Sequence, residues 1–394
     1  MLNSIIRFSI RNKLIIALSV LALIVWGGFA ISRLPVDALP DITSNQVQVI
    51  TVSPSLAAPE VERLITFPIE QANANIPGVT EMRSISRFGL SVVTIVFDDA
   101  TDTYWARQQV SERLIQVREQ IPVSAGRPEL APATTGLGEV FQYIIRPKKG
   151  YEGKYDLAEL RSIQDWIVRR QLLGTPGVAD VSSFGGRLKQ YEIAVQPEKL
   201  KSLNVTISDV FEALEKNNQN SGGAYIEKGP TALFIRTEGL VASTEEIGQI
   251  VVRHTSQGIP VFINDVADVR IGHAVRYGAM TYSDEGEVAG AVVLMLKNAN
   301  ASAVIRDIKK RMGQIKTTLP EGVVLETFYD RTKMVDRAIN TVSRNLLEGA
   351  LIVIFVLVLF LGNLRAGLIV ASVIPLSMLF AVIMMNLFGV SGNL

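Results

Sequence analysis

Residues 76–84 read IPGVTEMRS, and residues 175–183 read TPGVADVSS, 99 positions further along the chain. Both phrases contain Pro-Gly-Val, an acid two positions after the Val, and a final Ser. A single Pro-Gly-Val is a common turn and would carry little information. Two copies with similar surroundings, separated by a long period, favour a duplicated unit of helices and strands.

A helix is predicted before each copy, because apolar residues recur there at helical spacing. These residues are Val61, Leu64, Ile65 and Ile69 before the first copy, and Leu157, Leu160, Ile163 and Ile167 before the second. The second helix has a capping box of Asp156 and Glu159 at its start and Gly174 at its end. Strand-like segments follow the copies, LSVVTIVF at 90–97 and LKQYEIAVQ at 188–196. The repeated phrase is therefore predicted to be a turn in which Pro and Gly end a helix and Val begins a strand.

The composition excludes several classes of function. The chain has 394 residues, with 39 Lys and Arg against 38 Asp and Glu, so it lacks a basic excess and we expect no nucleic-acid partner. The absence of Cys excludes disulfides and thiolate metal sites. No GxxxxGK[ST] loop occurs, so nothing indicates nucleotide hydrolysis. We expect neither an enzyme nor a resident cofactor.

The first membrane crossing is predicted at 13–33, where residues 14–32 carry no charge and are long enough to span a bilayer. Three basic residues precede the apolar run: Arg7, Arg11 and Lys13. This charge bias predicts that residues 1–12 are cytoplasmic. A cleaved signal peptide is the alternative, but the apolar run is too long and no small-x-small cleavage site follows it, which favours an uncleaved helix.

Two further crossings are predicted at 341–362 and 366–388. The short connector 363–365 has Arg as its only charged residue, which is typical of a cytoplasmic turn. The long polar segment 34–340 then lies on the outer side of the membrane. Residues 389–394 resemble a loop that is cut short, and we expect the chain to be part of a longer protein.

The polar segment divides into two units and an insertion. The first unit is predicted at 34–135, and the second at 136–183 together with 276–332. Residues 184–275 form the insertion between the two parts of the second unit. Within it, NNQNSGGAYIEKG at 217–229 is too rich in Gly and Asn to form a core, and its composition alone favours a flexible surface loop. The predicted fold class is an α+β membrane protein, with transmembrane helices flanking repeated α/β subdomains.

Several phrases in the same order identify a family. They are RLPVDALPDI after the first helix, TGLGEVFQY at 135–143, DLAELRSIQDW at 156–166, GVADVSSFGG at 178–186, NNQNSGGAYIEKG at 217–229 and GNLRAGLIVASVIPLSML at 362–379. The chain resembles the N-terminal part of resistance-nodulation-division (RND) efflux transporters, and most closely their heavy-metal-efflux branch of the CzcA/CusA type. The resemblance extends over the whole chain.

The resemblance implies a proton-driven pump that is a homotrimer in the inner membrane. The two α/β units would be periplasmic porter subdomains, and the insertion at 184–275 a docking subdomain. Residues 217–229 would form an arm that reaches a neighbouring protomer. Such pumps pass their substrate to a periplasmic adaptor and an outer-membrane channel, and their proton-relay acids lie in the helix after those present here. Two alternatives remain: an RND pump for organic compounds, and a membrane-anchored binding or assembly subunit without transport activity.

Two acids are candidate metal ligands, Glu139 and Asp180. Glu139 stands directly before an apolar strand, and by resemblance carboxylates near the porter cleft bind zinc, cobalt, nickel or cadmium. A solvated acid at a strand end is the alternative for Glu139. For Asp180 the alternative is an acid that suits the turn, because Glu81 has the same place in the first copy. His254 and His273 are too isolated to form a ligand pair, and we expect them at the surface.

Overall fold

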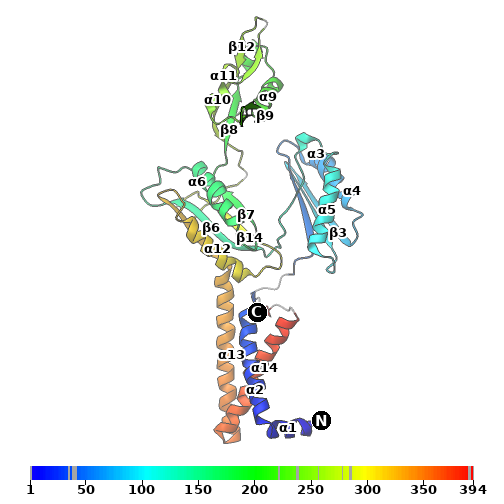
Figure 1. The fold of residues 1–394 in the computed structure, drawn as a ribbon, viewed down its shortest axis with the longest axis vertical. Helices are drawn as coiled ribbons and strands as arrows, with labels where there is room; N and C mark the ends of the chain where they lie inside the picture. The colour runs from blue at the N-terminus through cyan, green and yellow to red at the C-terminus, as the bar shows by residue number, and fades with distance from the viewer. Residues whose placement is uncertain are drawn as a thin grey trace.

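The computed structural model describes residues 2–33, 36–37, 42–220, 222–236, 239–255, 257–276, 278–283, 286–388 and 392–393. Figure 1 shows long helices at one end of the molecule, two α/β units beyond them, and the insertion at the far end. The segment 34–41, which follows the first crossing, and the loop expected at 389–394 lie mostly outside the described residues. Their described parts, β1 (Val36–Asp37) and β16 (Gly392–Asn393), pair in parallel.

The first unit is a four-stranded sheet with helices packed on one face. Its elements are β2 (Gln46–Val52), α3 (Ala58–Val61), η1 (Glu62–Thr66), α4 (Phe67–Asn73), β3 (Val79–Arg87), β4 (Leu90–Phe97), α5 (Thr103–Val117), η2 (Val123–Ala125) and β5 (Glu129–Leu130). The strands lie in the order β3-β4-β2-β5. Every second residue of β2 is buried, as expected for a strand with one face on the core.

The second unit repeats this arrangement. Its elements are β6 (Glu139–Pro147), α6 (Leu157–Ile163), η3 (Gln164–Val168), α7 (Arg169–Leu173), β7 (Val178–Gly185), β14 (Ala289–Met295), α12 (Ala301–Ile315) and β15 (Val323–Asp330). The sheet order β7-β14-β6-β15 corresponds strand by strand to β3-β4-β2-β5. Both units are therefore split βαβ folds, and the predicted duplication is confirmed.

The repeated phrase is the turn from the helical segment into the second strand of each unit, β3 or β7. Gly78 and Gly177 have φ angles of 82° and 80°, which favour glycine. The strands begin at Val79 and Val178, as predicted. A Cβ added at Gly177 would collide with Val304 of α12, so the glycine also lets the turn after α7 pack closely against α12.

The insertion replaces a tight hairpin. In the first unit only Phe88 and Gly89 separate β3 from β4, whereas the insertion lies between β7 and β14. It contains β8 (Lys189–Val195), α8 (Pro197–Ser202), α9 (Ile207–Lys216), β9 (Gly222–Lys228), β10 (Thr231–Arg236), α10 (Thr244–Gly248), β11 (Val251–His254), β12 (Pro260–Phe262), α11 (Ile263–Val266) and β13 (Ala267–His273). Its buried residues, among them Val210, Ile247 and Val266, form a core separate from those of the two units.

The strand-like segments that follow the two copies do not have equivalent places in the two units, in agreement with the assignment of 184–275 to the insertion. The segment LKQYEIAVQ forms β8, which pairs with β13 inside the insertion and is not the counterpart of β4. The counterpart of β4 is β14, far along the chain. Gly185 and Gly186, with φ angles of 67° and 65°, turn the backbone away from the sheet before β8 begins. Both segments have the same strand pattern, so periodicity alone did not distinguish their partners.

Among the described residues, three helices are long and apolar enough to cross a membrane: α2 (Lys13–Arg33), α13 (Arg331–Leu361) and α14 (Leu364–Leu387). A shorter helix, α1 (Leu2–Arg11), precedes them. The helix α13 begins at Arg331, directly after β15, rather than at the expected 341. The second crossing is therefore continuous with the second α/β unit (Figure 1).

Candidate functional site

Glu139 is the first residue of β6, and its side chain is exposed. The strand that follows is buried at Val140, Phe141 and Tyr143, so the acid does stand at the entrance to a buried strand, as the sequence indicated. Its carboxylate accepts a hydrogen bond from Gln142 Nε2 at 3.2 Å. This neutral contact leaves the charge of Glu139 available to a cation.

Asp180 lies on the edge strand β7 and is already paired. Arg169 of α7 places Nη2 3.0 Å from Asp180 Oδ1, and its Nε donates to the carbonyl of Val181 at 2.8 Å. The second contact fixes the guanidinium at the sheet edge, where it neutralises the carboxylate. A cation at Asp180 would have to displace Arg169 in this conformation.

The register of the sheet brings the two candidate acids to the same level. Leu294 of β14 pairs with Glu139 on one side and with Asp180 on the other. Two strand spacings therefore separate their backbones, roughly 10 Å. Within the described residues, no group of three or more His, Asp or Glu side chains could hold a metal ion. The two acids alone would leave a divalent ion under-coordinated.

A polar network lies beside Asp180, under the π-helical turn η3. Arg161 pairs with Asp165 at 2.8 Å, and Ser183 Oγ donates to the same carboxylate at 2.5 Å. The buried Gln164 donates to Ser183 Oγ at 3.2 Å and accepts from Tyr143 Oη at 2.9 Å. Burial raises the pKa of Tyr143 well above its ordinary value, although the hydrogen bond to Gln164 opposes this effect.

The first unit carries a smaller network at the corresponding place. Its π-helical turn η1 ends at the buried Thr66, whose hydroxyl is 2.7 Å from Ser86 Oγ and 2.8 Å from Ser91 Oγ. Single π-turns are frequent at functional sites, and here both units have one against the sheet. Sequence periodicity did not reveal either turn.

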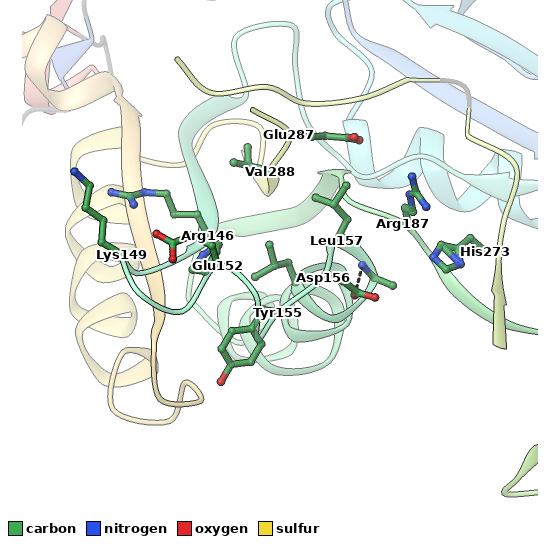
Figure 2. Close-up of a pocket in the computed structure, with 13 residues that line it drawn as sticks. Arg146, Lys149, Glu152, Tyr155, Asp156, Leu157, Arg187, His273, Glu287 and Val288 are labelled. Atoms are coloured by element: carbon green, nitrogen blue, oxygen red, sulfur yellow. Dashed lines mark hydrogen bonds between the residues drawn. The ribbon is translucent and has the colours of Figure 1, made fainter. Parts of the chain in front are cut away.

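A cavity of about 540 Å³ lies at the junction of the second unit and the insertion. Figure 2 shows the residues that line it. Its charged lining includes Arg146, Lys149, Glu152, Asp156, Arg187, His273 and Glu287. Arg146 pairs with Glu326 at 2.9 Å, and Glu287 pairs with Arg276. No ion pair of Lys149 or Arg187 occurs among the described residues. The positive and negative charges of the lining therefore balance, and neither candidate metal ligand belongs to it.

His273 was expected at the surface as an isolated residue, but it is half-buried in the wall of this cavity, near Arg187 (Figure 2). The two residues flank the insertion, one at its start and the other at the end of β13. Their separation in the sequence gave no sign that they share a wall.

The architecture defines a class of protein: a polytopic membrane protein in which duplicated α/β units are joined directly to apolar helices. Comparison with known proteins identifies the family. Residues 5–394 match the AcrB/AcrD/AcrF family, and the chain belongs to that family.

Comparison with individual relatives indicates which branch of the family the chain is similar to. The chain is 44% identical over 398 residues to the cobalt-zinc-cadmium resistance protein CzcA of Cupriavidus metallidurans, covering 100% of this chain and 37% of that protein. It is 38% identical over 394 residues to the cation efflux system protein CusA of Escherichia coli K12, with the same coverages. A crystal structure of a heavy metal efflux pump (crystal form II) has a TM-score of 0.90 and 34% identity, and the match covers 99% of this chain and 38% of that chain.

The expected resemblance to the heavy-metal-efflux branch of RND transporters is thereby confirmed. Members of the family are transporters. The chain spans about 37% of the length of the curated relatives that it matches.

Proposed function

We propose that this chain forms part of an inner-membrane, proton-driven efflux pump for divalent heavy-metal cations, with zinc, cobalt, nickel and cadmium as candidate substrates. The observation that carries the proposal is the 44% identity, over the whole chain, to a cobalt-zinc-cadmium resistance protein. The two α/β units joined to membrane helices are consistent with porter subdomains that move relative to each other.

The test is metal tolerance in a bacterium that lacks its own exporters. The complete protein that contains this chain, produced with its adaptor and outer-membrane channel, should raise tolerance to at least one of the four metals. Tolerance to organic compounds without tolerance to any metal would favour the other branch of RND pumps. No change in either, with normal amounts of protein in the membrane, would favour a binding or assembly subunit.

For topology, we propose that 34–340 is periplasmic and that 1–12 and 363–365 are cytoplasmic. The chain has no Cys, so each engineered Cys is unique. Gly150 and Asn363 are exposed and lie on opposite sides of the membrane in this arrangement. An impermeant thiol reagent added from outside should modify Gly150→Cys and not Asn363→Cys. The reverse pattern would contradict the proposal.

For assembly, we propose a homotrimer in which the β9–β10 hairpin reaches a neighbouring protomer. All residues of β9 are exposed, and Phe234 of β10 remains 81% exposed beside Tyr225. An exposed aromatic pair on a two-stranded hairpin is typical of a binding element rather than of an isolated loop. Cross-linking from Phe234→Cys to a second subunit should yield dimers and trimers, and exclusively monomeric product would contradict the arm.

For the metal site, we propose that Glu139 is a ligand in the porter cleft, and that Asp180 joins it only when Arg169 releases the carboxylate. Further ligands must come from outside the described residues. Glu139→Gln in the complete protein should reduce metal tolerance without reducing its amount in the membrane. The control is Glu119→Gln, which removes an exposed acid at the end of the first unit's second helical segment. Equal tolerance in both variants would exclude Glu139 from the site.

A further inference from the structure

The helix α1 has a charged face and an apolar face. Arg7 and Arg11 are four residues apart and share one side of the helix, while apolar residues occupy positions 2, 5, 6, 8 and 10. The side chains of Ile6, Phe8 and Ile10 are 51%, 52% and 64% exposed. A short helix with this division of side chains is typical of helices that lie in the plane of a membrane surface.

The position of α1 fits such a surface. The helix ends at Arg11, the regular structure is interrupted at Asn12, and the first crossing begins at Lys13. Figure 1 shows α1 turned away from the axis of α2, at the end of the bundle where α13 turns into α14. The junction of α1 and α2 therefore lies where the hydrocarbon of a bilayer would end. The apolar face of α1 can then enter the headgroup region while α2 spans the interior.

The charges at this end of the bundle are all of one sign. They belong to Arg7, Arg11, Lys13 and Arg365, all exposed. No Asp or Glu occurs in residues 1–36 or 349–394. No ion pair of these four residues occurs in the described parts of the chain, so their counter-charges must come from the surroundings. At a bilayer surface, anionic lipid headgroups can supply them.

We propose that α1 is an interfacial helix that binds anionic lipid headgroups through Arg7 and Arg11 while Ile6 and Ile10 enter the bilayer. The helix would fix the end of α2 at the surface and set the depth of the first crossing. This role is independent of which substrate the complete protein transports.

The experiment follows the depth of α1 in nanodiscs. An environment-sensitive fluorophore on Ile10→Cys is compared in phosphatidylcholine alone and in phosphatidylcholine mixed with phosphatidylglycerol. We expect blue-shifted emission in the mixed bilayer, and a return toward the aqueous spectrum at high salt. Replacing both Arg7 and Arg11 by Gln should lower the ratio of docked to undocked helix about fivefold per charge.

The matched control is Lys199→Gln with Lys201→Gln, which removes two exposed charges from α8 in the insertion and should leave the spectrum unchanged. An aqueous spectrum in both bilayers would overturn the interfacial position. If the fluorophore were equally buried in both bilayers, and remained so after the loss of Arg7 and Arg11, the recognition of anionic lipid would be overturned. Either result would leave the proposed transport function untouched.

Discussion

Lys309 of α12 holds Asp330 through an ion pair of 2.6 Å at the point where the second α/β unit becomes a membrane helix. Asp330 is the last residue of β15 and the N-cap of α13, and its Oδ1 accepts hydrogen bonds from the backbone NH and the hydroxyl of Thr332 at 3.0 and 2.6 Å. One buried carboxylate thus ties a helix and a strand of the unit to the start of the second crossing. Movement of α13 would be passed to α12 through this contact.

Replacing Asp330 by Ala should lower the free energy of unfolding by about 1–2 kcal/mol, since both the cap and the ion pair are lost. The control is Asp336→Ala, which removes an exposed acid from the same helix and should change stability by less than about 0.5 kcal/mol. Thermal unfolding in detergent measures both. Equal unfolding temperatures for the two variants would show that the Asp330 cap and its ion pair with Lys309 do not contribute to stability.

The same contact predicts a pH dependence. Burial alone would raise the pKa of Asp330, but the hydrogen bonds from Lys309 and Thr332 outweigh burial and lower the pKa. Its contribution to stability is therefore present above the ordinary pKa of an aspartate, about 3.9, and lost as the pH falls through the folded-state value. Stability of the wild type should fall more steeply toward acid pH than that of Asp330→Asn. Parallel pH profiles would contradict this.

The turn glycine of the second unit should tolerate no side chain. Gly177→Ala combines a left-handed backbone with a collision against Val304, and should destabilise by about 2–4 kcal/mol. Gly150→Ala is the control, because Gly150 has a similar φ of 91° but open space around it. The difference between the two variants in denaturant unfolding measures the collision alone. A smaller loss of unfolding free energy at Gly177 than at Gly150 would mean that α12 shifts to accommodate the added methyl group at little cost.

Two adjacent glycines in α2 should respond differently to enlargement. A Cβ at Gly27 would lie 2.8 Å from Leu379 Cδ2 of α14, whereas nothing lies within 4 Å of a Cβ at Gly28. Close approach at small residues is a main source of helix association in membranes. Gly27→Leu should therefore lower the unfolding temperature in detergent, and Gly28→Leu should not. The opposite order would contradict the packing of α2 on α14.

The buried hydroxyl of Tyr143 predicts an alkaline limit to stability. Burial raises its folded-state pKa, so the folded protein keeps the proton after the unfolded chain has released it. Stability should then fall as the pH rises above about 10, the ordinary pKa of a tyrosine. Tyr143→Phe should weaken this alkaline slope, while leaving Gln164 Oε1 without its donor at a cost of about 1–3 kcal/mol at neutral pH. An unchanged slope would contradict the assignment.

The duplicated turn, the helices before and after it, and the apolar helices could all be predicted from the amino-acid sequence. These features depend on local properties: the spacing of apolar residues, the φ angle that Gly78 and Gly177 adopt, and the length of uncharged runs. The positions of Glu139 and Asp180 on strands could also be predicted, since each stands next to a clear strand pattern.

The pairing of the strands became clear from the tertiary structure. It showed that β14, rather than the segment after the second copy, completes the second sheet, and that Leu294 lies between Glu139 and Asp180. It also paired Asp180 with Arg169 and placed His273 in a cavity wall. These relations join residues far apart in the chain, and similar strand patterns compete for each partner. The choice among them depends on the packing of the whole unit, because local periodicity is the same for every candidate.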